Sequence, residues 1–242
     1  NQLKLRAGFG LLGNQNIPNY AYMTFYQPAY SNGIVGFTPE DSRYGNPDLK
    51  WEKQKQYNLG FDASLLNNRL SFTGDMFYMR NTDLLMRMAL WPSFGYNYQI
   101  ANVGELENKG IEFSMNALVI DAKDFKWRIS GNIAHDKNTI KKLANGVDVL
   151  WNGGNIMSRD GNLFVGQSLN SFYTFQAEKI AQQSDMNRIN GMTFYNGYIV
   201  KPGDILPRDL DGDGKITPEN DMAIVGKSDP KFYGGLTTNF VY

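Results

Sequence analysis

Long stretches of this chain alternate apolar and polar residues with a period of two. In 57–65 the odd positions are apolar and the even ones are polar or small, and 70–78 continues the alternation, blurred only at Gly74 and Phe77. The two stretches meet at 67–68, an Asn-Asn pair that tolerates the positive φ of a tight hairpin turn. Because side chains of a strand point alternately to opposite faces, this period predicts half-buried strands and not helices.

The same alternation recurs in four further segments. A second pair of apolar rows, 111–117 and 125–133, flanks the polar turn 121–124, and alternating segments also open and close the chain. We therefore predict six strands, at about 2–12, 54–66, 69–80, 109–120, 125–135 and 231–242.

The predicted connections alternate between short turns and long loops. The long loops cover about 13–53, 81–108 and 136–230, and their parity places all three at the same end of the sheet. Outer-membrane barrels have short periplasmic turns and long extracellular loops, whereas a soluble sandwich has no reason to segregate them. We therefore predict an all-β fold: an antiparallel transmembrane β-barrel segment in the outer membrane of a Gram-negative bacterium, with the long loops extracellular.

Composition agrees with this interpretation and removes several other classes. A mean hydropathy of -0.44 suits a barrel, because half of each strand faces the lumen and stays polar. The 24 basic and 24 acidic side chains cancel, so bulk charge gives no sign of a nucleic-acid partner. The chain has no cysteine, which excludes a disulfide scaffold and thiol catalysis. Six strands are fewer than the eight of the smallest bacterial barrels, so we expect a fragment of a longer chain.

Several motifs follow one another along the chain. They are KLRA at 4–7 leading to GNQNI at 13–17, NPDLKWEK at 46–53, NVGELENKGIE at 102–112, GDI at 203–205, DLDGDGKI at 209–216 and DPKF at 229–232. In this order they resemble the SusC/RagA family of TonB-dependent outer-membrane transporters.

The resemblance implies a barrel of about 22 strands with a plugged lumen. Residues 1–242 would then be part of the C-terminal β-barrel domain, with the plug domain absent from this chain. It also implies a SusD-like surface lipoprotein that docks as a lid, surrounding outer-membrane lipid, and coupling to TonB through regions outside this chain. The implied function is import of oligosaccharides or peptides.

The segment 209–221 has the spacing of an EF-hand loop. Carboxylates stand at positions 1, 3 and 5, glycine at position 6 and a backbone carbonyl at position 7, so that oxygens converge on a hard cation. Position 12 is an asparagine where a bidentate glutamate is usual, and an aspartate follows it. The alternative is a metal-free Asp/Gly turn exposed to water. We predict a structural Ca²⁺ held by Asp209, Asp211, Asp213, the Lys215 carbonyl, Asn220 and Asp221.

Aromatic residues crowd the predicted long loops. Aromatic faces beside asparagine and glutamine bind sugars through apolar contact and hydrogen bonds, although such rings also pack loops against one another. The candidates for contact with an oligosaccharide or peptide substrate are Tyr20, Tyr22, Trp91, Phe94, Tyr96 and Trp151.

No residue set predicts an enzyme. His135 is the only histidine and stands at the end of a strand pattern. The carboxylate pairs at 105/107 and 121/124 fall in segments expected to be polar turns or loops, and no nucleophile, base and oxyanion set emerges. The alternative function from another class is a soluble calcium-stabilised β-sandwich that binds cell-surface glycans.

Overall fold

The computed structural model describes residues 1–146, 148–150 and 163–242, which divide into two compact units. The sheet unit comprises Asn1–Leu150, Phe164–Ser168 and Pro230–Tyr242. Among the described residues the small unit comprises Leu163 and Leu169–Asp229.

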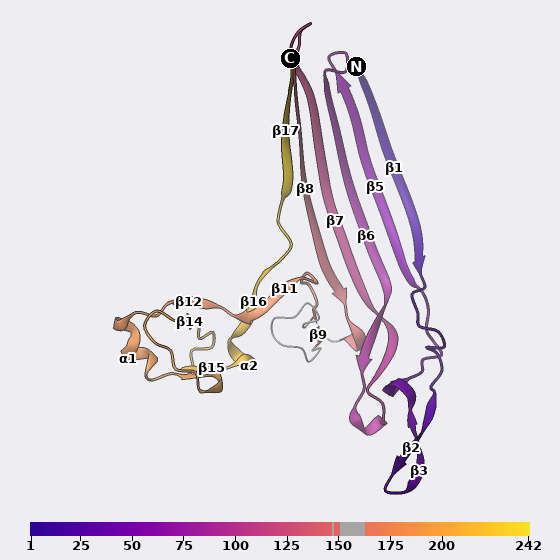
Figure 1. The fold of residues 1–242 in the computed structure, drawn as a ribbon, viewed down its shortest axis with the longest axis vertical. Coiled ribbons are helices and arrows are strands. Elements are labelled where there is room, and N and C mark those ends of the chain that lie inside the picture. The colour runs from indigo at the N-terminus through magenta and orange to yellow at the C-terminus, as the bar shows by residue number, and fades with distance from the viewer. Residues whose placement is uncertain (147, 151–162) are drawn as a thin grey trace. The chain divides into compact units, whose positions relative to one another are not determined.

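The sheet unit is dominated by six long antiparallel strands (Figure 1). Their order across the sheet follows the chain, so each long strand pairs with the long strand that precedes it in the sequence. The strands are β1 (Gln2–Asn14), β5 (Glu52–Leu65), β6 (Leu70–Ala89), β7 (Tyr98–Asp121), β8 (Lys126–Lys142) and β17 (Tyr233–Val241). The all-β antiparallel fold and the six predicted strands are thereby confirmed.

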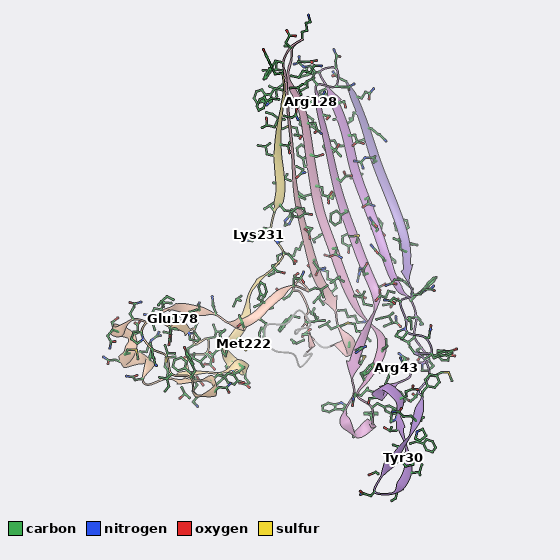
Figure 2. All side chains as sticks on the ribbon, viewed as in Figure 1. Tyr30, Arg43, Arg128, Glu178, Met222 and Lys231 are labelled. Atoms are coloured by element: carbon green, nitrogen blue, oxygen red, sulfur yellow. The ribbon has the colours of Figure 1, made fainter. Side chains whose placement is uncertain are left out.

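Short strands lie at the end of the sheet from which the long connections leave, which we call the loop end. β4 (Arg43–Tyr44) runs parallel to the start of β7. β2 (Tyr26–Ser31) and β3 (Ile34–Pro39) form a hairpin whose tip carries Tyr30, at the opposite end of the unit from Arg128 (Figure 2). β9 (Val149–Leu150) and β10 (Leu163–Phe164) flank the segment outside the described residues.

The two faces of the sheet differ in polarity as the alternation predicts. One row across the strands reads Phe61, Gly74, Phe113 and Ile133, and the adjacent row on the other face reads Asp62, Thr73, Ser114 and Asn132. The apolar side chains are open to their surroundings: Phe113 is 41% exposed and Leu236 79%. An apolar face of this extent marks a surface that meets lipid or another protein.

Both tight turns lie at the end of the sheet that carries the chain termini (Figure 1). Leu66, Asn67 and Asn68 have φ of 53°, 55° and 64°, so the positive φ predicted for the asparagine pair is confirmed. The second turn closes with a 2.9 Å hydrogen bond from the Ala122 N–H to the Phe125 carbonyl. Both connections at this end, 66–69 and 122–125, are therefore as short as predicted.

The strands extend further at the loop end than predicted. Pairing of β6 with β7 continues to Ala89 and Tyr98, so the predicted loop 81–108 shrinks to 90–97, and β8 continues to Lys142. A bulge between Asn81 and Leu84 shifts the register, which interrupts the period of two in the sequence. Glu105 and Glu107, expected in a loop, consequently lie in β7.

The small unit has a hydrophobic core of its own, within what was predicted as one long loop. Its strands pair as β11 (Ser171–Phe175) with β16 (Met222–Lys227), β12 (Ala177–Ile180) with β14 (Ile205–Pro207), and β13 (Thr193–Phe194) with β15 (Lys215–Ile216). Two short helices, α1 (Met186–Ile189) and α2 (Pro218–Asp221), complete it. The core side chains are at most 8% exposed: Ala181, Ile189, Phe194, Val200, Leu206 and Ile216.

Within the described ranges, no helix has the length and apolar character needed to cross a membrane.

Candidate metal and ligand-binding sites

Three carboxylates of the small unit converge at the predicted calcium loop. One oxygen each of Asp209, Asp211 and Asp221 lies within 4.8 Å of the others. Asp221, in α2, is fully buried and accepts hydrogen bonds from the backbone N–H groups of Leu210 and Thr217, both at 2.8 Å. These two bonds attach α2 to both ends of the acidic loop and direct its carboxylate toward the other two.

Two glycines shape the loop around Asp209. Gly212 and Gly214 both have φ of 77°, which their lack of a Cβ permits, and both donate a backbone N–H to the Asp209 carboxylate at 2.7 and 2.9 Å. These backbone hydrogen bonds, with that of Gly214 the strongest influence, hold the pKa of Asp209 below its ordinary value. The carboxylate is therefore ionised at neutral pH.

The residues present suit a hard cation. Three carboxylates lie together, and in the described part of the chain none of them forms an ion pair with lysine or arginine. Like charges this close repel one another unless a cation lies between them. All-oxygen carboxylate sets are the ligands that Ca²⁺ takes.

The other predicted ligands hold different places. Asn220 donates its side-chain amide to Asp211 at 2.8 Å, so it lies at the edge of the three carboxylates. Asp213 is not part of the converging group, and its carboxylate accepts the N–H of Lys215 at 2.7 Å. Lys215 itself begins β15. The aspartate after position 12, and not the asparagine at that position, thus supplies the buried carboxylate.

The predicted substrate-binding aromatics divide into packed and open rings. Tyr96 is packed: its hydroxyl contacts that of Tyr26, and its ring lies 4.9 Å from that of Tyr44. Tyr44 was not predicted, because it stands in a polar segment and only the pairing of β4 with β7 brings it to Tyr96. Tyr20 packs edge-on against Phe25 at 6.0 Å.

The remaining aromatics offer free faces. Trp91 is 77% exposed and Phe94 62%, and Tyr22 is likewise exposed. In the described residues none of the three makes a ring–ring contact. Trp151 lies outside the described residues. The open rings therefore come from two connections at the loop end of the sheet.

Asparagine side chains join two of the motif segments that are distant in sequence. Asn102 accepts the N–H of Lys50 at 2.8 Å and donates to the carbonyls of Lys50 and Asp83 at 2.6 and 2.8 Å. Asn46 donates to the carbonyl of Ile100 at 2.9 Å. The NPDLKWEK segment is thereby held along the start of β7, and it orders the loops that carry the aromatics.

The polar groups considered for catalysis have structural partners. His135 contacts the carbonyl of Lys231, and its ring packs on Phe232 at 5.0 Å. Glu105 pairs with Arg80 at 2.6 Å, and Glu107 pairs with two lysines of the sheet. These contacts account for the histidine and for the acidic pair of β7 without chemistry.

Comparison with known proteins gives a consistent result. The family model "TonB dependent receptor-like, beta-barrel" matches residues 1–207. TonB-dependent receptor P3 of Formosa agariphila is 33% identical over 99% of this chain and 24% of its own length. TonB-dependent receptor SusC of Bacteroides thetaiotaomicron is 37% identical over 72% of this chain and 19% of its own length.

Solved structures agree with the sequence relatives. The RagAB peptide transporter superposes with a TM-score of 0.73 at 25% identity, over 99% of this chain and 25% of the other. The RagAB peptide importer in its "open-open" state gives a TM-score of 0.74 at 25% identity, over all of this chain and 24% of the other. The chain spans about a quarter of the length of these relatives.

The Asn102 bridge yields a testable prediction. Asn102→Asp places a carboxylate oxygen against the carbonyls of Lys50 and Asp83, where the amide now donates twice. We expect the free energy that keeps the NPDLKWEK segment in place to fall by about 1–3 kcal/mol. Tryptic cleavage after Lys50 in the folded full-length protein should then become at least about fivefold faster. Asn116→Asp, at an exposed asparagine of the same strand, is the control. Equal cleavage rates in the two variants would contradict the bridging role.

Proposed function

This chain belongs to the TonB-dependent receptor-like β-barrel family, as its resemblance to SusC/RagA proteins predicted, and on that premise we propose that it forms one wall of an outer-membrane importer for oligosaccharides or peptides. The observation that carries the proposal is the open apolar face of the six long strands. In a barrel this face meets lipid, the polar face lines the lumen, and the outer edges of β1 and β17 pair with strands outside this chain.

The height of the apolar face fits a bilayer. On β8 it lies between Trp127, which stacks on Phe240 at 5.6 Å, and Lys137. These residues are about ten positions apart, which at about 3.4 Å per residue and a tilt of about 40° gives about 26 Å. The lipid-facing band of outer-membrane barrels is about 25 Å tall. Trp127 would then mark one interface and the row of Lys137 the other.

The connections between the long strands indicate how the sheet is oriented in the membrane. The two tight turns leave one end of the sheet, and the three longer connections all leave the other. We place the turns in the periplasm and the longer connections outside the cell, by the rule that governs outer-membrane barrels. The small unit, which lies between β8 and β17 in the chain, is then extracellular.

Capture of cargo is assigned to the loop end. Trp91, Phe94 and Tyr22 expose ring faces suited to sugars or to apolar side chains of peptides. A SusD-like lipoprotein would close over these loops as a lid, and TonB would act through regions outside this chain. Cargo passes unchanged, so the protein is not an enzyme. A soluble β-sandwich is not favoured, because in the described residues every other sheet has only two strands.

We assign a structural Ca²⁺ to Asp209, Asp211 and Asp221, with Asn220 and the Lys215 carbonyl as further candidates. Asp213 is the weakest of the predicted ligands, because its carboxylate is not among the three that converge. A cation here would neutralise three adjacent negative charges and fix α2 to the acidic loop. The role of the cation would be to order the small unit, and it would take no part in transport or catalysis.

Removal of calcium tests this assignment. In the full-length protein we expect EGTA to accelerate proteolysis within 169–229, because calcium at about a hundred times its Kd stabilises the bound fold by about 2.7 kcal/mol. Asp211→Asn should cleave at the EGTA rate with or without calcium. Glu219→Gln removes an exposed carboxylate of the adjoining helix α2 and should respond like wild type. If EGTA leaves the wild-type rate unchanged, the loop is a metal-free turn.

The importer proposal is tested on the native full-length protein. We expect it in detergent-solubilised outer membranes together with a SusD-like lipoprotein, identified by mass spectrometry of an affinity pull-down. Deletion of the gene should abolish growth on one oligosaccharide or peptide source and leave growth on monosaccharides and amino acids intact. A water-soluble protein without a membrane partner would contradict the proposal and favour the glycan-binding module.

A further inference from the structure

The apolar face of the sheet ends toward the loops in a row of two tyrosines and two lysines. Tyr57, Tyr78, Lys109 and Lys137 are successive cross-strand partners on β5, β6, β7 and β8, and we call them the tyrosine–lysine row. The rings of the two tyrosines lie 6.2 Å apart, which confirms that they share a face. The row therefore lies where the apolar band gives way to polar surroundings.

An apolar groove adjoins this row on its membrane side. It has a volume of about 560 Å³ and is lined by Leu59, Met76 and Ile111, which with His135 form the next row of cross-strand partners, and the tyrosine–lysine row is its rim. All three apolar side chains are more than half exposed. A groove with an apolar floor and a cationic rim has the polarity of an anionic lipid.

The charges at the rim are not balanced within the described residues. Lys109 and Lys137 are direct cross-strand partners, an arrangement that is destabilising between like charges. Glu107 offsets part of this charge, since its carboxylate lies 3.4 Å from both Lys109 and Lys141 and accepts the Tyr78 hydroxyl at 3.1 Å. Lys137 has no carboxylate within ion-pair distance in the described ranges.

We propose that this groove binds a phosphate-bearing lipid of the outer membrane. Its acyl chains would lie against Leu59, Met76 and Ile111, and its phosphates would accept hydrogen bonds from the ammonium groups of Lys109 and Lys137. The anion would relieve the repulsion between the two lysines. This inference rests on the proposed function in one respect: it requires the apolar face to meet the bilayer.

The groove favours a lipid over a free phosphate ion as the occupant. A free ion would contact only the two exposed lysines, in full competition with water and salt. A lipid adds burial of acyl chains along an apolar floor that is continuous with the rest of the lipid-facing surface. Both attractions act at one place, because Lys109 stands directly above Ile111 on β7 and pairs across the strands with Lys137.

The test measures lipid retained by the full-length protein. Purified protein is incubated in mild detergent with lipid A that carries both phosphates, and bound lipid is counted by native mass spectrometry. We expect Lys109→Gln combined with Lys137→Gln to retain about tenfold less lipid A than wild type. Lys4→Gln combined with Lys126→Gln, which neutralises two lysines whose register positions fall on the polar face, should retain as much as wild type.

Two further arms keep the test decisive. On the wild-type protein, lipid A stripped of both phosphates should bind as poorly as the intact lipid binds the double variant, and inorganic phosphate should not displace bound lipid A. Equal retention of intact and stripped lipid, or displacement by inorganic phosphate, would overturn the proposal even if the variants fail to fold. If either of these outcomes were found in protein that folds and still captures the lipoprotein, only the lipid proposal would fail, and the importer function would be unaffected.

Discussion

The structure depends on the need of every backbone N–H and C=O group to find a partner where no water is present. In a bilayer only a helix or a closed sheet meets that need. The sheet unit meets it with uninterrupted ladders: β5 pairs with β1 and with β6 along nearly its whole length, without a break in register. Because the ladder fixes the backbone, side chains are free to be apolar on one face and polar on the other. The open row of Phe61, Phe113 and Ile133 is the direct consequence.

Beyond the tyrosine–lysine row, toward the loop end, the same strands continue with a different pattern of side chains. There ion pairs such as Arg80–Glu105 lie among buried apolar residues such as Leu106, and a bulge between Asn81 and Leu84 is tolerated. Loops are then held by side-chain amides, as by Asn102, and the small unit folds around its own apolar residues. The proposed calcium belongs to the small unit, where three carboxylates can share a cation.

Local periodicity and turn chemistry were enough to predict the long strands and the first turn. Alternation located all six strands, and the Asn67–Asn68 pair located the turn between the second and third of them. Alternation could not locate the strand ends: 99–108 mixes apolar and polar residues on both faces and carries no period of two, although it remains in the ladder. The core of the small unit was missed because Leu206 and Ile216 stand in strands of two or three residues. Among the candidate ligands, the spacing of the acidic residues pointed to the loop 209–221. Only the fold shows that Asp221 lies beside Asp209 and that Asp213 lies outside the converging group. Tyr44 likewise reaches Tyr96 only through a long-range pairing.

The central claim is that the apolar face of the sheet meets lipid and the other face does not. This chain has no cysteine, so single cysteines can be introduced at Phe113 and Ser114, adjacent residues of β7 on opposite faces. Each would carry a fluorophore in full-length protein freed of other cysteines and reconstituted with brominated lipid. We predict strong quenching at position 113 and little at 114. Equal quenching at both positions, or quenching at neither, would contradict the claim.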